Sequence, residues 1–406
     1  MAVLLIGTLD TKGTEIGYVR DFLHQAGIAA LVMDAGVLGE PTITADISRE
    51  AVFLAAGASL AAMRKLGDRG QAITKAAEGA AKLAVKLHGE GKISGVLGLG
   101  GSAGTTIGTS AMRALPYGLP KLAVSTLASG QVSHYVGVRD IMMMPSVVDL
   151  CGLNRLSRQI LGNAASAMIG MVQSAITGAR PQAAEKSLVA ASMFGVTTPC
   201  VEHARTQIES AGYEVLVFHA VGTGGRTMEA MIRDGLIAGV LDITTTELAD
   251  ELVGGILSAG KDRMTAAAIR GIPQVISLGA LDMVNFGPRD TVPEKFKDRR
   301  FYQHNANVTL MRTTPEENDA LGKAIAKKAS AARGPTAVLI PLRGVSAIDK
   351  EGGPFWWPEA NAALFQSIRN WVGPMVKVIE LDMHINDPAF ADNAVRTLLE
   401  EINRRK

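Results

Sequence analysis

The sequence predicts an α/β protein made of two related halves, each with a parallel β-sheet flanked by helices. Three observations lead to this fold class. Short apolar runs alternate with amphipathic runs, glycine-rich segments follow several apolar runs, and four elements of the first half recur in the same order in the second. Strands that alternate with helices are typical of parallel sheets. At about 150 residues per domain, a chain of 406 residues has room for two or three domains.

The first half begins with a buried strand and a loop that leads into a helix. The apolar run at residues 3–7 is followed by the loop Gly7–Gly13. An amphipathic run from Glu15 to Gln25 then ends at Gly27, which we expect to be the helix C-cap. Further strands are expected at residues 29–34, 93–97 and 119–124.

The second half repeats these elements. Strands are expected at residues 188–194, 214–219, 237–241 and 272–276, in the order of the first half, and near 337–340 and 376–381 to complete the second sheet. Thr198 and Pro199 predict the N-cap and first turn of a helix. The segment Gly178–Gln182 has the composition of a linker. We therefore predict two domains, residues 1–180 and 187–406, related by internal duplication.

Composition and charge favour a soluble globular protein of the cytoplasm. With 41 basic and 39 acidic residues and 47% hydrophobic residues, intrinsic disorder is excluded. The charges are interleaved, so no basic stripe of the kind that binds nucleic acid is expected. No apolar run reaches the roughly 18 residues of a membrane span, and the N-terminus lacks the basic region of a signal peptide. The two cysteines are far apart and predict no structural disulfide.

The strongest candidate for ligand binding is the glycine-rich segment Gly98–Thr106, which follows an apolar strand and begins a helix. Glycines let backbone N–H groups approach an anion closely, and a helix N-terminus adds partial positive charge. The segment has neither the P-loop pattern nor the glycine spacing of the dinucleotide fingerprint. A tight turn with glycines required only for packing is the alternative. The residues expected to bind phosphate or carboxylate are Gly100, Gly101, Ser102, Gly104, Thr105 and Thr106.

The loop after the first strand is a second candidate. Lys12 is expected to neutralise a phosphate as a point charge. Thr11 adds a hydroxyl, and Asp10 is a candidate for holding Mg²⁺ or a ribose hydroxyl. The alternative is a turn capped by Asp10 with an exposed lysine.

A third candidate follows a strand of the second half. Gly224, Gly225 and Arg226 lie at the start of a helix, where arginine would supply a bidentate fork to an anion. His219 ends the preceding strand and is a candidate acid/base. A hydrogen-bonded structural histidine is the alternative.

The segment Asp242–Glu247 is the counterpart of the first loop, with hydroxyls and acids in place of glycines. Thr245 is expected to bind the ligand, and Glu247 is a candidate acid/base or Mg²⁺ ligand. The alternative is a threonine N-cap followed by acids that the helix dipole favours. Weaker candidates are Ser129 and Arg343 as ligand-binding residues and, as a metal pair on one strand face, Asp382 and His384.

Taken together, three motifs resemble one family. The motifs GTLDTKG, GLGGSAGTT near residue 100 and HAVGTGGRTMEAMI near residue 225 are similar to those of the UPF0261 proteins. The similarity extends to about residue 403 through LDITTTELADEL, GALDMVNFGP and PLRGVSAIDKEGGPFWWPEAN. The resemblance implies two Rossmann-like domains, a homodimer and a Tm-1-like ATP-binding domain. In plant relatives this region precedes a TIM barrel, which makes a TIM-barrel protein a candidate partner.

These observations lead to one main functional hypothesis and two alternatives. The main hypothesis is binding of ATP with Mg²⁺, or of a similar phosphorylated ligand, in a cleft between the two halves. The first alternative is an enzyme that acts on a small carboxylate or phosphorylated sugar acid, with Arg226 orienting the acid. The second is a non-catalytic interaction subunit. Neither the motifs nor the resemblance indicates a reaction.

Overall fold

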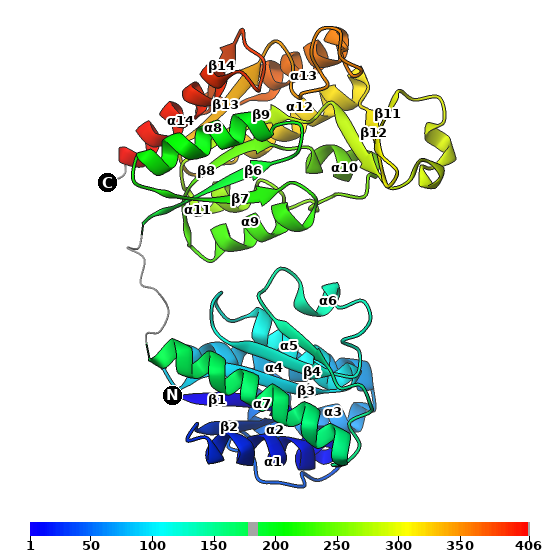
Figure 1. The fold of residues 1–406 in the computed structure, drawn as a ribbon, viewed down its shortest axis with the longest axis vertical. Coiled ribbons are helices and arrows are strands. Elements are labelled where there is room, and N and C mark those ends of the chain that lie inside the picture. Colours follow the sequence, from blue (N-terminus) through cyan, green and yellow to red (C-terminus); the bar gives the residue numbers. More distant parts are fainter. Residues whose placement is uncertain (178–185, 405–406) are drawn as a thin grey trace. The chain divides into compact units, whose positions relative to one another are not determined.

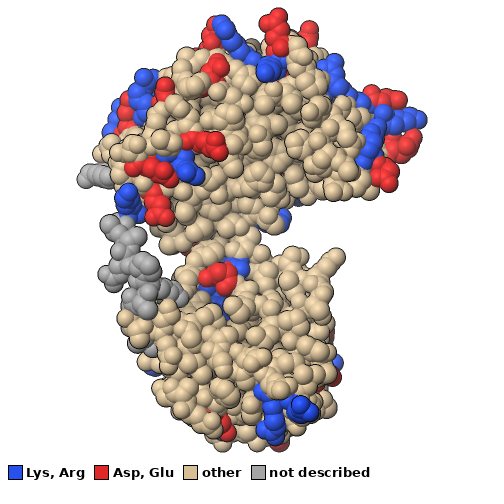
Figure 2. Space-filling view, in the orientation of Figure 1, with Lys and Arg blue, Asp and Glu red and all other residues tan. Residues whose placement is uncertain are grey.

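The computed structural model describes residues 1–177 and 186–404. The chain divides into two compact units between residues 183 and 184. The predicted linker Gly178–Gln182 and the predicted domain end at residue 180 lie outside the described residues. Within those residues, no helix is both long enough and apolar enough to cross a membrane. On the face drawn in Figure 2, basic and acidic side chains lie close to one another over both units.

The first domain is a five-stranded parallel sheet with helices on both faces (Figure 1). The strand order is β2-β1-β3-β4-β5, which is a doubly wound order. Its elements are β1 (Ala2–Gly7), α1 (Leu9–Gln25), β2 (Ala30–Asp34), α2 (Arg49–Ala55), α3 (Leu60–Leu66), α4 (Arg69–Gly89), β3 (Ile93–Gly100), α5 (Ser102–Arg113), β4 (Lys121–Ser125), α6 (Ser133–Val136), β5 (Met142–Pro145) and α7 (Arg155–Ile176).

Alternating side chains of the strands form two apolar layers. Val3 and Leu5 of β1 pack with α1 and α7 on one face of the sheet. Leu4 and Ile6 pack with α2, α4 and α5 on the other. Burial on both faces explains why these strands are continuous apolar runs in the sequence.

The second domain has a six-stranded parallel sheet in the order β7-β6-β8-β9-β13-β14, and a separate antiparallel sheet, β10-β12-β11. Helices α8 and α14 cover one face of the large sheet, and α9 to α13 cover the other. The elements are β6 (Leu188–Met193), α8 (Thr198–Ser210), β7 (Glu214–His219), α9 (Thr223–Arg233), β8 (Ile237–Thr244), α10 (Glu247–Val253), α11 (Ala266–Arg270), β9 (Gln274–Gly279), β10 (Met283–Phe286), β11 (Phe301–Asn305), β12 (Val308–Arg312), α12 (Pro315–Ser330), β13 (Thr336–Pro341), α13 (Pro358–Trp371), β14 (Lys377–Leu381) and α14 (Pro388–Asn403).

The two domains share details that confirm the predicted duplication. In both domains, the register of the first strand shifts by one residue against the strand beside it. In β1 the shift lies between Ala2 and Val3, where β1 pairs with β3, and in β6 it lies between Leu188 and Val189, where β6 pairs with β8. Gly95 and Gly239, which follow these shifts, let the last helix of each domain pack closely on the sheet. A Cβ at Gly95 would lie 2.9 Å from Met168 Sδ of α7, and one at Gly239 would lie 2.6 Å from Ile402 Cδ1 of α14. Strands β13 and β14 complete the second sheet, as expected.

Two predicted helix starts are wrong, and so is the placing of Asp382 and His384 on a strand face. Helix α1 begins at Leu9 rather than Glu15, because the Asp34 carboxylate at the end of β2 accepts the Leu9 N–H at 3.0 Å and stabilises an earlier first turn. The N-cap of α8 is Thr197, one residue before the predicted position. Strand β14 ends at Leu381, so Asp382 and His384 lie in the following turn rather than on a strand face.

Candidate ligand-binding site

The strand order of the first domain creates a crevice between β1 and β3. From β1 the chain continues to β2 on one side of the sheet, and from β3 it continues to β4 on the other. The two connections therefore leave the carboxyl end of the sheet in opposite directions. The place between β1 and β3 where they part is the switch point, at which doubly wound proteins bind their ligands. The two strongest sequence candidates, the segments after β1 and β3, both lie here.

A cavity of about 470 Å³ opens at this switch point, within the size range of small-molecule sites. One end is polar and is formed by the first turns of α1 and α5. The rest is lined by the segment after β2 and by α3 and α4, where apolar Met63, Ala72 and Ile73 occur together with charged Arg64, Asp68 and Arg69. Ile107 of α5 also lines the cavity.

The N-terminus of α5 supplies the backbone donors of the polar end. Its N-cap is Gly101, so no N-cap side chain takes up the free N–H groups. The amides of Ser102, Ala103 and Gly104 come too early in the helix to find an intrahelical acceptor. All four residues line the cavity. The positive end of the α5 dipole is therefore exposed to the cavity.

Close packing explains two of the glycines in this segment. A Cβ at Gly104 would lie 2.9 Å from the carbonyl oxygen of Leu99, and one at Gly100 would lie 2.9 Å from the Cα of Gly104. Strand β3 and helix α5 thus meet with no room for a side chain. Packing therefore requires glycine at both positions, and Gly104 also lines the cavity.

Helix α1 adds side chains to the same end of the cavity. Thr8, Thr11 and Lys12 line it, and the two threonine hydroxyls lie 2.7 Å apart. The Lys12 ammonium donates to the carbonyl oxygen of Leu150 and retains two further N–H donors. Asp10 also lines the cavity, but its Oδ2 accepts the backbone N–H groups of Leu38 and Gly39 at 3.0 and 3.1 Å.

Several lining residues were not predicted from the sequence. Arg64 and Arg69 on α3 and α4 also line the cavity, and no local pattern marks them. Asp149 is an exposed carboxylate that accepts no hydrogen bond from the described residues. It follows β5 by four residues at the carboxyl end of the sheet, which is the signal that would have found it.

Other predicted ligand residues of the first domain have internal partners. Thr105 is buried, and its hydroxyl lies 2.6 Å from that of Ser125. The Thr106 hydroxyl donates to the carbonyl oxygen of Ser102 at 2.8 Å. Ser129 lies in an exposed loop and is not among the residues that line the cavity.

In the second domain, another helix N-terminus, that of α9 after β7, already holds a carboxylate. Oε1 of Glu247 accepts the backbone N–H groups of Gly222 and Gly225 at 2.7 and 3.0 Å. A Cβ at Gly225 would lie 2.1 Å from Glu247 Oε2, so the carboxylate fills the space above α9. At Gly224, a Cβ would meet the carbonyl oxygen of His219 at 1.8 Å, so this glycine is required for packing. Arg226 is exposed and donates to the carbonyl oxygen of Ser258 at 3.2 Å.

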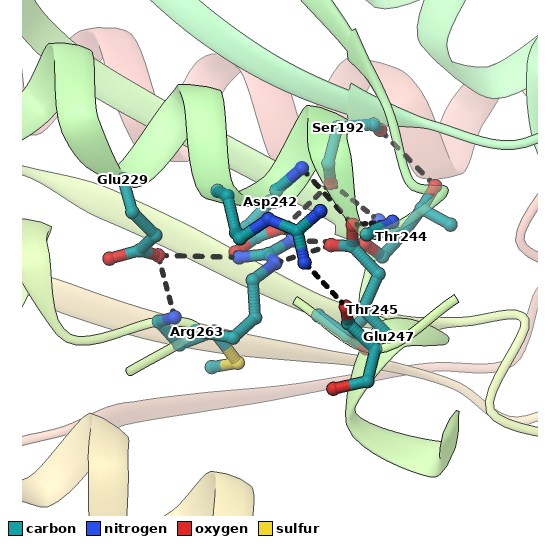
Figure 3. A network of polar contacts seen from close by, with 12 residues as sticks. Ser192, Glu229, Asp242, Thr244, Thr245, Glu247 and Arg263 are labelled. Carbon is teal, nitrogen blue, oxygen red and sulfur yellow. Dashed lines mark hydrogen bonds and ion pairs between the residues drawn. The ribbon is translucent and has the colours of Figure 1, made fainter. Parts of the chain in front are cut away.

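Glu247 belongs to a buried network centred on Arg263 (Figure 3). The Arg263 guanidinium lies 2.7 Å from Glu247, 2.6 Å from Asp242 and 3.6 Å from Glu229, and all four side chains are at most 4% exposed. Burial alone would lower the pKa of Arg263, but the adjacent Asp242 and Glu247 carboxylates raise it well above its ordinary value. Burial raises the pKa of Glu229, although Arg263 opposes this shift. The network satisfies Glu247 internally, which favours the structural alternative for this residue.

The remaining candidates of the second domain also make contacts within the protein. The Thr245 hydroxyl donates to the carbonyl oxygen of Ser277 at 3.1 Å. The His219 ring packs against the Phe194 ring with centroids 5.4 Å apart. Arg343 forms a bidentate ion pair with Asp382, both bonds being 2.8 Å. Among the described residues, no three His, Cys, Asp or Glu side chains cluster as metal ligands would.

Fold and site together define a class: a duplicated protein of two doubly wound, Rossmann-like α/β domains, with an open helix N-terminus in a cavity of the first. The chain belongs to the UPF0261 family. The N-terminal domain of the Uncharacterised protein family (UPF0261) matches residues 1–177, and its C-terminal domain matches residues 186–402.

Relatives match over nearly the whole chain. A UPF0261 protein of Clostridium tetani is 49% identical over 404 residues, 99% of each chain. One from Rhizobium meliloti is 48% identical over 97% of each chain. The ToMV susceptible protein tm-1(GCR26) of Solanum lycopersicum is 40% identical over 98% of this chain, which spans 55% of the tomato protein. The solved structure of the glycosyltransferase VinC with dTDP covers the whole chain at 10% identity, but a TM-score of 0.19 carries no argument.

Proposed function

We propose that the first domain binds a phosphorylated ligand, with ATP as the reference compound, in the cavity between the first turns of α1 and α5. The amides of Ser102, Ala103 and Gly104 would receive the phosphate oxygens. Lys12 would neutralise charge from the opposite side of the same end.

The observation that carries this proposal is the uncapped N-terminus of α5 inside a cavity. The second domain provides an internal comparison, since the N–H groups of Gly222 and Gly225 at the start of α9 are satisfied by Glu247. At α5, no N-cap side chain accepts a hydrogen bond from these N–H groups, and the first turn lines the cavity. An anion from solution would satisfy the same physical requirement there.

The apolar side chains that line the cavity favour a nucleotide over a small acid. Met63, Ala72 and Ile73 offer a surface that a base or another apolar group would cover, whereas a keto acid would leave it exposed to water. Mg²⁺ would enter together with the nucleotide, and Asp149 is the lining carboxylate whose oxygens accept no hydrogen bond from the described residues. These groups bind and neutralise charge, so the function they support is ligand binding.

The test places a carboxylate at the proposed phosphate position. Ser102→Glu puts a negative charge in the first turn of α5, where it repels an anion, and Ser102→Gln is the neutral control of similar size. Binding of ATP and of inorganic tripolyphosphate, each with and without Mg²⁺, is measured by isothermal titration calorimetry. We expect Ser102→Glu to lose both ligands and Ser102→Gln to retain them.

Ser102→Glu should not lower thermal stability, since an acid near a helix N-terminus is stabilising by about 0.3–1 kcal/mol. Loss of binding would then not reflect unfolding. Wild-type protein that binds neither ligand at millimolar concentration, or Ser102→Glu protein that binds both normally, would refute the proposal.

A further inference from the structure

One wall of the cavity is an irregular segment of the chain. Residues 35–46, between β2 and α2, form neither helix nor strand. Val37 and Leu38 of this segment line the cavity, and Leu38 is 78% exposed. An apolar side chain exposed at a cavity becomes favourable to bury when a ligand covers it.

Charged side chains from three helices hold this segment in place. Asp10 of α1 accepts the N–H groups of Leu38 and Gly39 through one oxygen. Nε of Arg64 in α3 donates to the carbonyl oxygen of Val37 at 2.6 Å. Arg49 of α2 donates to Gly39. Backbone hydrogen bonds from Ala35 to Gly7 and from Thr42 to Leu9 anchor the segment on either side, and Asp34 accepts the Gly36 N–H at 2.8 Å. Between these anchors, Asp10, Arg49 and Arg64 are the side chains that bind the backbone of Val37, Leu38 and Gly39.

Asp10 connects this wall to the polar end of the cavity, where Lys12 and the first turn of α5 are proposed to bind the anion. It lies in the first turn of α1, two residues before Lys12, and lines the cavity. A Cβ at Gly36 would lie 2.8 Å from its Oδ1, so the start of the segment packs directly on the carboxylate. Oδ2 is thus taken by two amides, and Oδ1 lies against the backbone of Gly36.

We infer that Asp10 is a positioning residue, which holds Val37–Gly39 as a wall beside the anion end and thereby selects ligands that carry an apolar group next to their phosphate. This inference rests on the proposed function and refines its substrate class. A nucleotide would contact both the N-terminus of α5 and the wall at Leu38. Free polyphosphate would contact only the former.

The experiment compares ATP with inorganic tripolyphosphate for Asp10→Asn, Leu38→Ala and the double variant. Two hydrogen bonds to a charged group are lost or weakened in Asp10→Asn, so we expect ATP affinity to fall about tenfold. Tripolyphosphate affinity should change by less than about twofold. If Asp10 acts through Leu38, the two losses will not add in the double variant. Leu54→Ala, at an exposed leucine of α2 outside the lining residues, is the control and should bind both ligands normally.

Two further readouts separate this role from others. Amide exchange at Leu38 and Gly39 should quicken in Asp10→Asn without any ligand, which a residue that only touches phosphate would not cause. The ratio of ATP affinities with and without Mg²⁺ should be the same in Asp10→Asn and wild type. Loss of the Mg²⁺ effect would instead assign Asp10 as a metal ligand and overturn the inference.

Equal losses of ATP and tripolyphosphate would overturn the inference as well, since Asp10 would then act on the anion end itself. Failure of the proposed function has a different signature, because wild-type protein would bind neither compound. Unchanged amide exchange in Asp10→Asn would show that the carboxylate does not hold the wall.

Discussion

Replacing Asp250 by asparagine should remove a pH dependence of stability from the second domain. Asp250 on α10 is fully buried. Its Oδ1 accepts the Asn285 N–H at 3.0 Å, and its Oδ2 accepts the Asn285 side-chain N–H at 2.6 Å. Burial raises the pKa of this carboxyl from 3.8 to about 7, with the hydrogen bonds of Asn285 opposing the shift and Glu247 adding to it.

The sign of the effect follows from the two states. Between about pH 4 and about pH 7, the folded protein retains a proton on Asp250 that the unfolded chain has released. The free energy of unfolding therefore falls as pH rises through this window and is level above it. At about 1.4 kcal/mol per pH unit, the total change attributable to Asp250 is up to about 4 kcal/mol.

The measurement is urea unfolding followed by tryptophan fluorescence. All three tryptophans, Trp356, Trp357 and Trp371, lie in the second domain, so this signal reports the domain that contains Asp250. The unfolding free energy of Asp250→Asn relative to wild type should increase by up to about 4 kcal/mol between pH 4 and pH 8. Asp282, whose pKa burial also raises to about 7, is present in both proteins and cancels. A difference that stays constant with pH, or that decreases, would refute the reasoning.

Two further predictions concern packing and charge. Arg263→Met leaves three buried carboxylates without their cation. The free energy of unfolding of the second domain should therefore fall by at least about 3–5 kcal/mol at pH 8, and by less at pH 5, where the acids take up protons. A loss under about 1 kcal/mol in urea unfolding would contradict a central role for Arg263. Gly104→Ala should destabilise the first domain by about 1–3 kcal/mol, since the new Cβ would meet Leu99 O at 2.9 Å. Calorimetric melting checks this against Gly108→Ala, whose Cβ would make an ordinary 3.5 Å contact; equal melting temperatures for the two variants would contradict it.

The apolar pattern predicts most of the fold because it records burial directly. Runs such as residues 3–6 are apolar at every position, since both faces of a parallel sheet are covered by helices. The repeat of four such runs predicts the duplication, and glycine-rich segments after strands predict which edge of the sheet carries ligands. The start of α1 was missed because its first turn depends on Asp34, which lies 25 positions further along the chain.

The candidate site was predicted only in part. The segments with Lys12 and with Gly101, Ser102 and Gly104 do line one cavity. Both helices start in glycine-rich segments. Local sequence therefore gave no indication that Glu247 accepts the free N–H groups at the start of α9, whereas no side chain caps the start of α5. The sequence made Asp10 a candidate for holding Mg²⁺ or a ribose hydroxyl, and only the structure showed that its Oδ2 accepts the backbone N–H groups of Leu38 and Gly39.

The sequence by itself determined the class of fold, the duplication and the places where helix N-termini meet the edge of each sheet. These follow from local hydrophobic periodicity and from glycine, which act over a few residues. Only the tertiary structure decided which N-terminus is open, since that depends on whether a carboxylate distant in the chain reaches it. The free energy of an unsatisfied N–H group is set by whatever lies within hydrogen-bonding distance in space, and no local pattern encodes that distance.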